Sequence, residues 1–175
     1  MNHPRRRATL TCLAAGLLTA ALPAVSAAAY PDKPIRLVVP FPPGQGADIL
    51  ARLIGQHLAA ALGQPIVVEN KVGAGGIIGT AFAAKAAPDG YTLYMGSSGP
   101  LAIGPHVYKA VGFDTLKDFA PISNIASVTQ VLVTAPASQL ASAKDVVERA
   151  RAQPGMVPFG SAGSGTTSHL TMELF

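Results

Sequence analysis

The chain of 175 residues contains a single cysteine, Cys12, and this cysteine lies in an N-terminal leader. Three arginines at positions 5–7 precede an apolar run over residues 10–24, and three alanines follow at positions 27–29. This order is typical of a secretory signal peptide. We therefore expect residues 1–29 to be a signal peptide, cleaved near Ala27–Ala29, and a mature chain that has no disulfide. The Sec route is the expected one, and the paired arginines leave the Tat route as the alternative.

Strong net charge is also lacking once the leader is set aside. Three of the thirteen Lys and Arg residues lie in the leader and none of the nine acidic residues does, which leaves ten cations against nine anions. Proteins that bind nucleic acid display an excess of positive charge. Nucleic acid is therefore not an expected partner, and the mature chain has the length of one ordinary domain.

Motifs for catalysis, cofactors and metals are absent as well. Neither Ser98 nor Ser164 is flanked by glycines at the spacing of a nucleophile elbow. The glycine pairs in residues 44–46 and 73–75 lack the third glycine of a dinucleotide site and the Lys-Ser/Thr of a phosphate loop. The four histidines stand apart at His3, His57, His106 and His169, without ligand spacing. We expect no enzyme activity, no cofactor and no metal.

What the sequence does contain is a strand–loop–helix unit. Residues 35–39 are mostly apolar, residues 40–46 hold three prolines and two glycines, and a helical apolar pattern runs from about Asp48 to Leu62 before Gly63. The pattern predicts a buried strand, a tight loop and a helix. The free N–H groups and the dipole at the start of such a helix form an anion site.

The alternation of strand and helix continues along the chain. We predict strands at residues 66–69 and 91–95, a glycine-rich loop at 70–76, a helix at 77–86 and a short helix ending near Tyr108. This order favours an α/β protein with a doubly wound parallel sheet.

The remaining sequence predicts a second strand–loop–helix corner. Residues 122–134 predict a long strand that crosses between two lobes near 128–134, and Ser142 with Asp145 predicts a capping box for a helix to Gln153. A strand at 157–159 then meets the glycine- and hydroxyl-rich residues 160–169, before a helix over 170–175. Two corners rich in donors suggest a clamp on a small anion.

Structural explanations compete with these functional ones. Glycines in short turns often serve backbone geometry alone, and Asp48 at a helix start can be a cap in place of a ligand contact. His57 lies on the apolar helix face and is expected to be packed, and Lys71 is expected to be solvated. For His169, a structural role and a ligand contact both remain open.

Six sequence blocks point to a known family. They are Tyr-Pro-Asp-Lys-Pro-Ile at 30–35, Val-Pro-Phe-Pro-Pro-Gly-Gln-Gly-Ala-Asp at 39–48, Val-Glu-Asn-Lys-Val-Gly-Ala-Gly-Gly at 68–76, Ala-Lys-Ala-Ala-Pro-Asp-Gly-Tyr-Thr-Leu at 84–93, Ser-Ala-Gly-Ser-Gly-Thr-Thr-Ser-His-Leu at 161–170, and Glu-Leu-Phe at 173–175. With these blocks the mature chain resembles the Bug-type solute-binding proteins, the extracytoplasmic receptors of tripartite tricarboxylate transporters.

The resemblance implies a two-lobed periplasmic-binding-protein fold of type II-like α/β class. It implies a monomer in the periplasm that binds a small carboxylate between its lobes and delivers it to membrane permease subunits. Carried over by position, the ligand site comprises Phe41, Gly44, Gln45, Gly46, Ala47, Asp48, Ser97, Ser98, Ser161, Ala162, Gly163, Ser164, Gly165 and Thr166.

This sequence departs from the family at three positions and in length. Gln45 and Ala47 stand where glycine and threonine are common, and Ile77 stands where asparagine is common. We expect a first lobe over residues 30–130 that lacks its return segment, and the beginning of a second lobe over 131–175. Two alternatives follow: a non-functional truncated piece of such a receptor, and a secreted hydrolase, for which no nucleophile is present.

Overall fold

A three-stranded parallel sheet lies at the centre of the computed structural model, which describes residues 29–175 and so leaves almost all of the expected signal peptide outside the described residues. Its strands are β1 (Ile35–Val39), β2 (Ile66–Asn70) and β3 (Thr92–Tyr94), in the order β2-β1-β3. The order places the first strand between the next two, as in doubly wound sheets. The predicted α/β class is confirmed.

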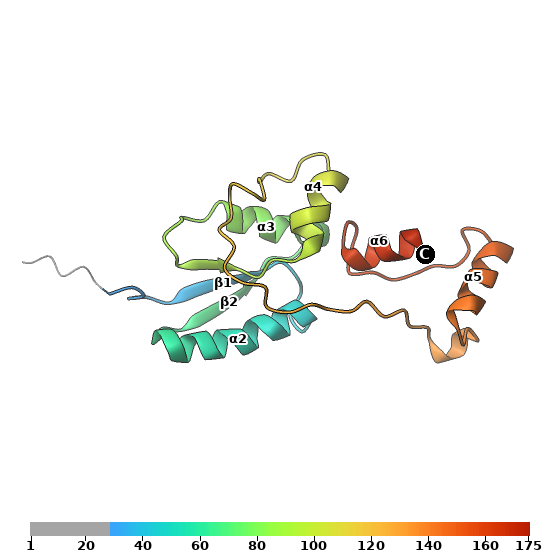
Figure 1. Ribbon diagram of the computed structural model, residues 1–175, viewed down its shortest axis with the longest axis horizontal. Coiled ribbons are helices and arrows are strands. Elements are labelled where there is room, and N and C mark those ends of the chain that lie inside the picture. Colours follow the sequence, from blue (N-terminus) through green and yellow to red (C-terminus); the bar gives the residue numbers. More distant parts are fainter. Residues whose placement is uncertain (1–28) are drawn as a thin grey trace, which may run out of the picture. The chain divides into compact units, whose positions relative to one another are not determined.

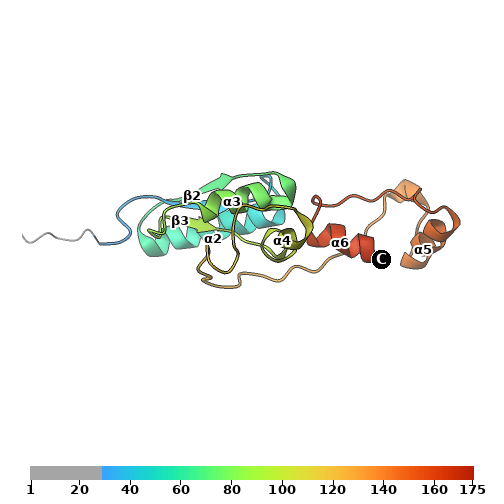
Figure 2. The ribbon, with the colours of Figure 1, turned by 90° about the horizontal axis from the view of Figure 1, so that it is seen from above.

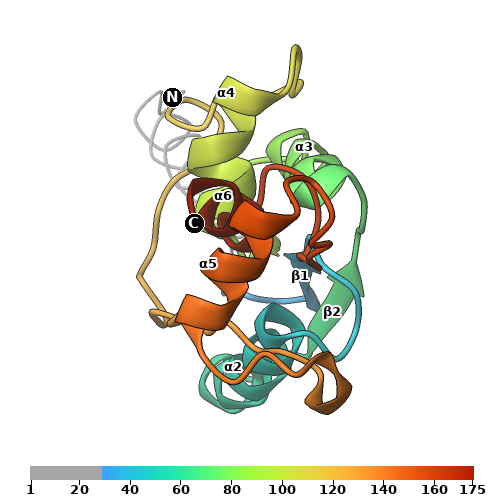
Figure 3. The ribbon, with the colours of Figure 1, turned by 90° about the vertical axis from the view of Figure 1, so that its right-hand side faces the viewer.

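Helices cover both faces of this sheet (Figures 1 and 3). Helix α2 (Gly46–Leu62) lies against one face and α3 (Ile77–Ala84) against the other. In the view from above, α3 overlies the sheet and α2 lies beneath it (Figure 2). The remaining helical segments are η2 (Ala74–Gly76), η3 (Gly99–Ile103), α4 (Gly104–Val107), η4 (Pro136–Ser138), α5 (Ala143–Ala152) and α6 (Thr167–Leu174).

The main core forms between the sheet and α2. Leu37 and Val39 of β1 are buried with Ala51 of α2 and with Met95 just after β3. Alternate residues of a strand point to one face, so Leu37 and Val39 meet α2 together. Helix α2 ends as predicted at Gly63, which has a left-handed φ of 68° and donates its N–H to the carbonyl of Ala59 at 3.0 Å.

The second face depends on a close approach of α3 to the end of β1. A Cβ atom added to Gly79 would lie 2.8 Å from the Cα of Pro40. Only glycine permits this spacing, which fully buries Val38 and Thr80 between the helix and the sheet. The Thr80 hydroxyl donates to the Gly76 carbonyl at 2.8 Å and also meets the Tyr94 hydroxyl at 2.5 Å.

One prediction for α2 is wrong. The sequence predicts that His57 is packed on the apolar face of α2, but His57 is exposed, and Leu53 of the same helix is 51% exposed. The buried face instead centres on Asp48, Ala51 and Gly55. These residues follow helical spacing, but Gly55 and Asp48 give no hydrophobic signal that a sequence pattern could use.

Two predicted strands are also absent from the described residues. Residues 122–134 and 157–159 are extended but form no ladder with another strand in the described chain. Ile122, Val128 and Val133 are 83%, 74% and 79% exposed. A β-branched pattern favours extended backbone, but a strand requires a partner for its N–H and C=O groups.

The final helices have the predicted caps. Ser142 and Asp145 form a capping box at the start of α5, with the Asp145 N–H donating to Ser142 Oγ at 3.2 Å. Helix α6 begins at Thr167, three residues before the predicted start, because Thr166 is the N-cap. No helix within residues 29–175 has the length and apolar character needed to cross a bilayer. The division into lobes at residue 130 stays a prediction.

Candidate functional site

The first predicted corner lies at the carboxyl end of β1. Phe41 follows the strand, Gly44 adopts a positive φ of 82°, and α2 begins two residues later at Gly46. A residue with a side chain is strained at this φ, so glycine suits the turn. The N–H groups of the first turn of α2 have no partner within the helix, as at any helix start.

Asp48 turns its carboxylate into the protein. The residue is 2% exposed, and Oδ2 accepts the Gly44 N–H and the Arg52 Nε–H, both at 2.9 Å. Its other oxygen, Oδ1, accepts Asn70 Nδ2 at 2.9 Å. Hydrogen bonds from Arg52, Gly44 and Asn70 hold the pKa of Asp48 well below its usual range. This environment favours the structural role, and a ligand contact by Asp48 stays a prediction.

The second predicted corner is a turn closed by its own hydroxyls. Thr166 Oγ1 donates to the Gly163 carbonyl at 2.6 Å and accepts the His169 N–H at 3.4 Å. Ser168 Oγ accepts the Ala162 N–H at 3.1 Å. These bonds fix the start of α6, whose first N–H groups point out of the helix end.

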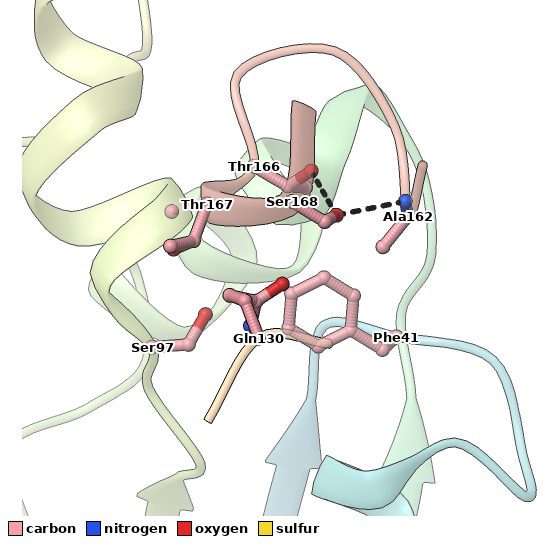
Figure 4. A pocket seen from close by; sticks show the side chains of 8 residues that line it. Phe41, Ser97, Gln130, Ala162, Thr166, Thr167 and Ser168 are labelled. Carbon is pink, nitrogen blue, oxygen red and sulfur yellow. Dashed lines mark hydrogen bonds between the residues drawn. The ribbon is translucent and has the colours of Figure 1, made fainter. Parts of the chain in front are cut away.

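A pocket of about 150 Å³ joins the two corners (Figure 4). Its lining residues are Phe41, Ser97, Gly99, Gln130, Ala162, Thr166, Thr167 and Ser168. The close-up shows Gln130 beside the Phe41 ring, facing the hydroxyl groups of the second corner. Segments far apart in the sequence therefore meet at one small hollow.

The pocket includes four of the residues predicted for the site, namely Phe41, Ser97, Ala162 and Thr166. Ten predicted residues lie outside its lining: Gly44, Gln45, Gly46, Ala47, Asp48, Ser98, Ser161, Gly163, Ser164 and Gly165. Among these ten, Ser98 contacts a lining residue, since its Oγ lies 3.0 Å from Thr167 Oγ1. Their direct contact with a ligand stays a prediction.

Sequence reasoning missed four lining residues: Gly99, Gln130, Thr167 and Ser168. Thr167 and Ser168 belong to the hydroxyl run that follows Thr166, so that run carried a usable signal. Gln130 carried none. It lies in an extended segment that was expected to be a strand, and only the path of this segment in three dimensions brings it to the pocket.

The lining is neutral and rich in hydrogen-bond groups. No lysine, arginine, aspartate or glutamate lines the pocket, whereas four lining residues carry hydroxyls and one carries a carboxamide. Such groups bind and orient a polar ligand but offer no obvious acid, base or activated nucleophile. Residues 29–175 hold no group of three or more His, Cys, Asp or Glu side chains placed to bind a metal ion.

The parallel sheet and the donor-lined pocket beyond its strand ends define an α/β ligand-binding protein. Residues 50–175 match the family described as "Tripartite tricarboxylate transporter family receptor". The chain belongs to this receptor family, and the prediction of a non-enzymatic protein is confirmed.

Relatives and solved structures agree with this assignment. Protein BugT of Bordetella pertussis is 45% identical over 152 residues, which cover 86% of this chain and 47% of BugT. The R. palustris protein Rpa4515, solved with adipate, is 36% identical with a TM-score of 0.80, covering 83% of this chain and 48% of that one. MatC from Rhodopseudomonas palustris, solved with bound malate, is 38% identical with a TM-score of 0.53, covering 55% and 33%. The chain spans about half the length of the curated relatives it matches.

Proposed function

We propose that this protein is an exported, periplasmic receptor that captures a small carboxylate and delivers it to the permease of a tripartite tricarboxylate-type transporter. The family assignment supports the receptor role. Two similar proteins solved with adipate and with malate support the ligand class. The neutral, donor-lined pocket is the proposed binding site.

The observation that carries this proposal is a pair of polar side chains left free in the pocket lining. The Ser97 hydroxyl and the Gln130 carboxamide both line the pocket, and neither has a hydrogen-bond partner among the described residues. A carboxylate oxygen can accept from both groups. Donors without a partner inside the protein can bind a ligand at no cost in internal hydrogen bonds.

A neutral site must supply several hydrogen-bond donors to bind a carboxylate tightly. A micromolar complex requires about 8 kcal/mol of net binding free energy. A hydrogen bond to a charged group gives roughly 1.5–3 kcal/mol before the cost of association. Several donors must therefore act together, and hydroxyls, the carboxamide and the start of α6 can supply them without an arginine.

The test is isothermal titration calorimetry of the protein with adipate and with malate, and with adipamide as the uncharged control. We expect at least one of the acids to bind and adipamide not to bind. Ser97→Ala should weaken that binding about tenfold. Ser123→Ala is the matched control, because Ser123 is exposed and its hydroxyl donates to the neighbouring Asn124 carbonyl at 3.3 Å.

Two results would contradict the proposal. Absence of binding to both acids in a well-folded preparation would remove the carboxylate assignment. Equal affinity in Ser97→Ala and the unaltered protein would remove the pocket assignment. Aggregation without a cooperative thermal transition would instead favour the incomplete-receptor alternative, for which the exposed apolar residues Ile122, Val128 and Val133 offer a physical reason.

A further inference from the structure

The loop between β1 and α2 is held at both ends by two side chains that do not line the pocket. Asn70 Nδ2 donates to the Phe41 carbonyl at 2.9 Å, and the Asp48 carboxylate accepts the Gly44 N–H at 2.9 Å. The same Asn70 nitrogen donates to Asp48 Oδ1 at 2.9 Å. Phe41 and Gly44 are thus linked through a single Asp48–Asn70 pair.

The loop has little freedom beyond these two points. Pro42 and Pro43 fix two consecutive φ angles. The Gln45 N–H donates to the Pro42 carbonyl at 3.3 Å, which closes a turn. The position of the Phe41 backbone therefore follows from the fixed loop together with the bond to Asn70.

Phe41 is the residue of this loop that lines the pocket, and its ring lies beside Gln130 (Figure 4). A shift of the Phe41 backbone would move the ring and change the pocket's width. Asn70 lies at the end of β2, so its hydrogen bond to the Phe41 carbonyl fixes the position of the loop relative to the sheet. Strand β1, with which β2 pairs, is the most buried strand of the sheet and provides a rigid reference.

We propose that Asp48 and Asn70 are positioning residues, which set the place of Phe41 and thereby the ligand affinity of the pocket without touching the ligand. This inference rests on the proposed carboxylate-binding function. It changes the role of Asp48 from the ligand contact that the family resemblance implied to a support behind the pocket wall. It also assigns a role to Asn70, which was not among the predicted site residues.

Arg52 supplies the matched control, because it binds the same pair but not the loop. Its Nε donates to Asp48 Oδ2 at 2.9 Å and its Nη2 donates to Asn70 Oδ1 at 3.3 Å. Half of its side chain is exposed. Arg52→Gln removes a charge partner of Asp48 while the Phe41 and Gly44 bonds remain.

Two readouts test the proposal on Asn70→Ala, Asn70→Asp and Arg52→Gln. The first is the hydrogen-exchange rate of the Gly44 amide in the free protein, measured by NMR. The second is the change in affinity for whichever acid binds the unaltered protein, compared in each variant with the change in its thermal midpoint. We expect both Asn70 variants to exchange Gly44 faster and to bind about tenfold more weakly or worse, and Arg52→Gln to retain affinity even if its midpoint falls.

Asn70→Asp is the sharper variant, since it keeps the side-chain shape. It places a second carboxylate against Asp48 and faces the Phe41 carbonyl with an acceptor. A purely structural role predicts that the loss of affinity is proportional to the fall in thermal midpoint, in the Asn70 variants and in Arg52→Gln alike. That result would overturn the proposal. Unchanged Gly44 exchange in Asn70→Asp would overturn it as well.

Failure of the proposed function is distinguishable from failure of this inference. If the unaltered protein binds neither adipate nor malate, the carboxylate assignment fails. The Gly44 exchange rate, which needs no ligand, then still decides whether Asn70 and Asp48 hold the loop.

Discussion

The hydroxyl of Tyr108 donates a hydrogen bond of 2.8 Å to the carbonyl oxygen of Ser164, which lies 56 positions further along the chain. The bond ties the residue that follows α4 to the turn of the second corner. The Tyr108 ring also lies close to Gly165, where an added Cβ would be 3.1 Å from the ring. One side chain thus anchors the turn by both a polar and a packing contact.

Tyr108→Phe should lower the free energy of unfolding by about 0.5–1 kcal/mol. The variant keeps the ring against Gly165 but leaves the Ser164 carbonyl without its donor. The bond is exposed, so water replaces part of it and the loss stays small. Urea unfolding followed by circular dichroism measures the change, and a midpoint equal to that of the unaltered protein would show that the hydroxyl adds no stability.

Gly75→Ala should destabilise the protein by clearly more than Gly112→Ala. Both glycines have positive φ, 60° and 75°, so both substitutions bring similar backbone strain, of order 1 kcal/mol. A Cβ at Gly75 would collide with the Ser164 carbonyl, whereas nothing lies within 4 Å of a Cβ at Gly112. The difference between the two thermal midpoints isolates the collision, and equal midpoints would mean that the turn moves away freely.

Gly46→Asp should abolish carboxylate binding while the protein still folds. No atom lies within 4 Å of a Cβ placed at Gly46, and an acidic residue in the first turn of a helix is favourable. The added negative charge would repel an anion at the same corner. Gly46→Asn adds similar bulk without charge and should retain most of the affinity. Isothermal titration calorimetry measures the carboxylate affinity of both variants. Unchanged affinity in Gly46→Asp would place the anion away from the start of α2.

Stability should fall with increasing pH between pH 10 and about 12, in part because of Tyr94. Burial raises the pKa of Tyr94 to about 12 from a usual value of 10.0, although its bond to Thr80 opposes the shift. The folded state keeps this proton in a range where the unfolded chain releases it, so the stabilisation is complete below pH 10 and is lost through pH 12.

The Tyr94 contribution can be measured as a difference. Thermal midpoints recorded from pH 8 to pH 12 should fall less steeply for Tyr94→Phe than for the unaltered protein. The ultraviolet difference spectrum between the two proteins reports the phenolate directly. If the two midpoint curves run parallel throughout this range, Tyr94 does not titrate differently in the folded and unfolded states.

Several elements of the fold could be predicted well because their signals are local. The apolar run at residues 35–39, the stop at Gly63 and the capping box at Ser142 each depend on neighbours within one or two turns. Residues 122–134 show the limit of such signals. Their β-branched pattern predicted a strand, but strand formation depends on a partner that no local pattern provides.

The candidate site divides in the same way. The sequence by itself determined the α/β class, the two glycine-rich corners and the family resemblance, because these depend on residue order and on local turn chemistry. Only the tertiary structure decided that Asp48 turns inward to Asn70 and that Gln130 reaches the pocket. The direction of a carboxylate and the path of an extended segment follow from contacts between residues far apart in the chain, and those contacts exist only once the chain has folded.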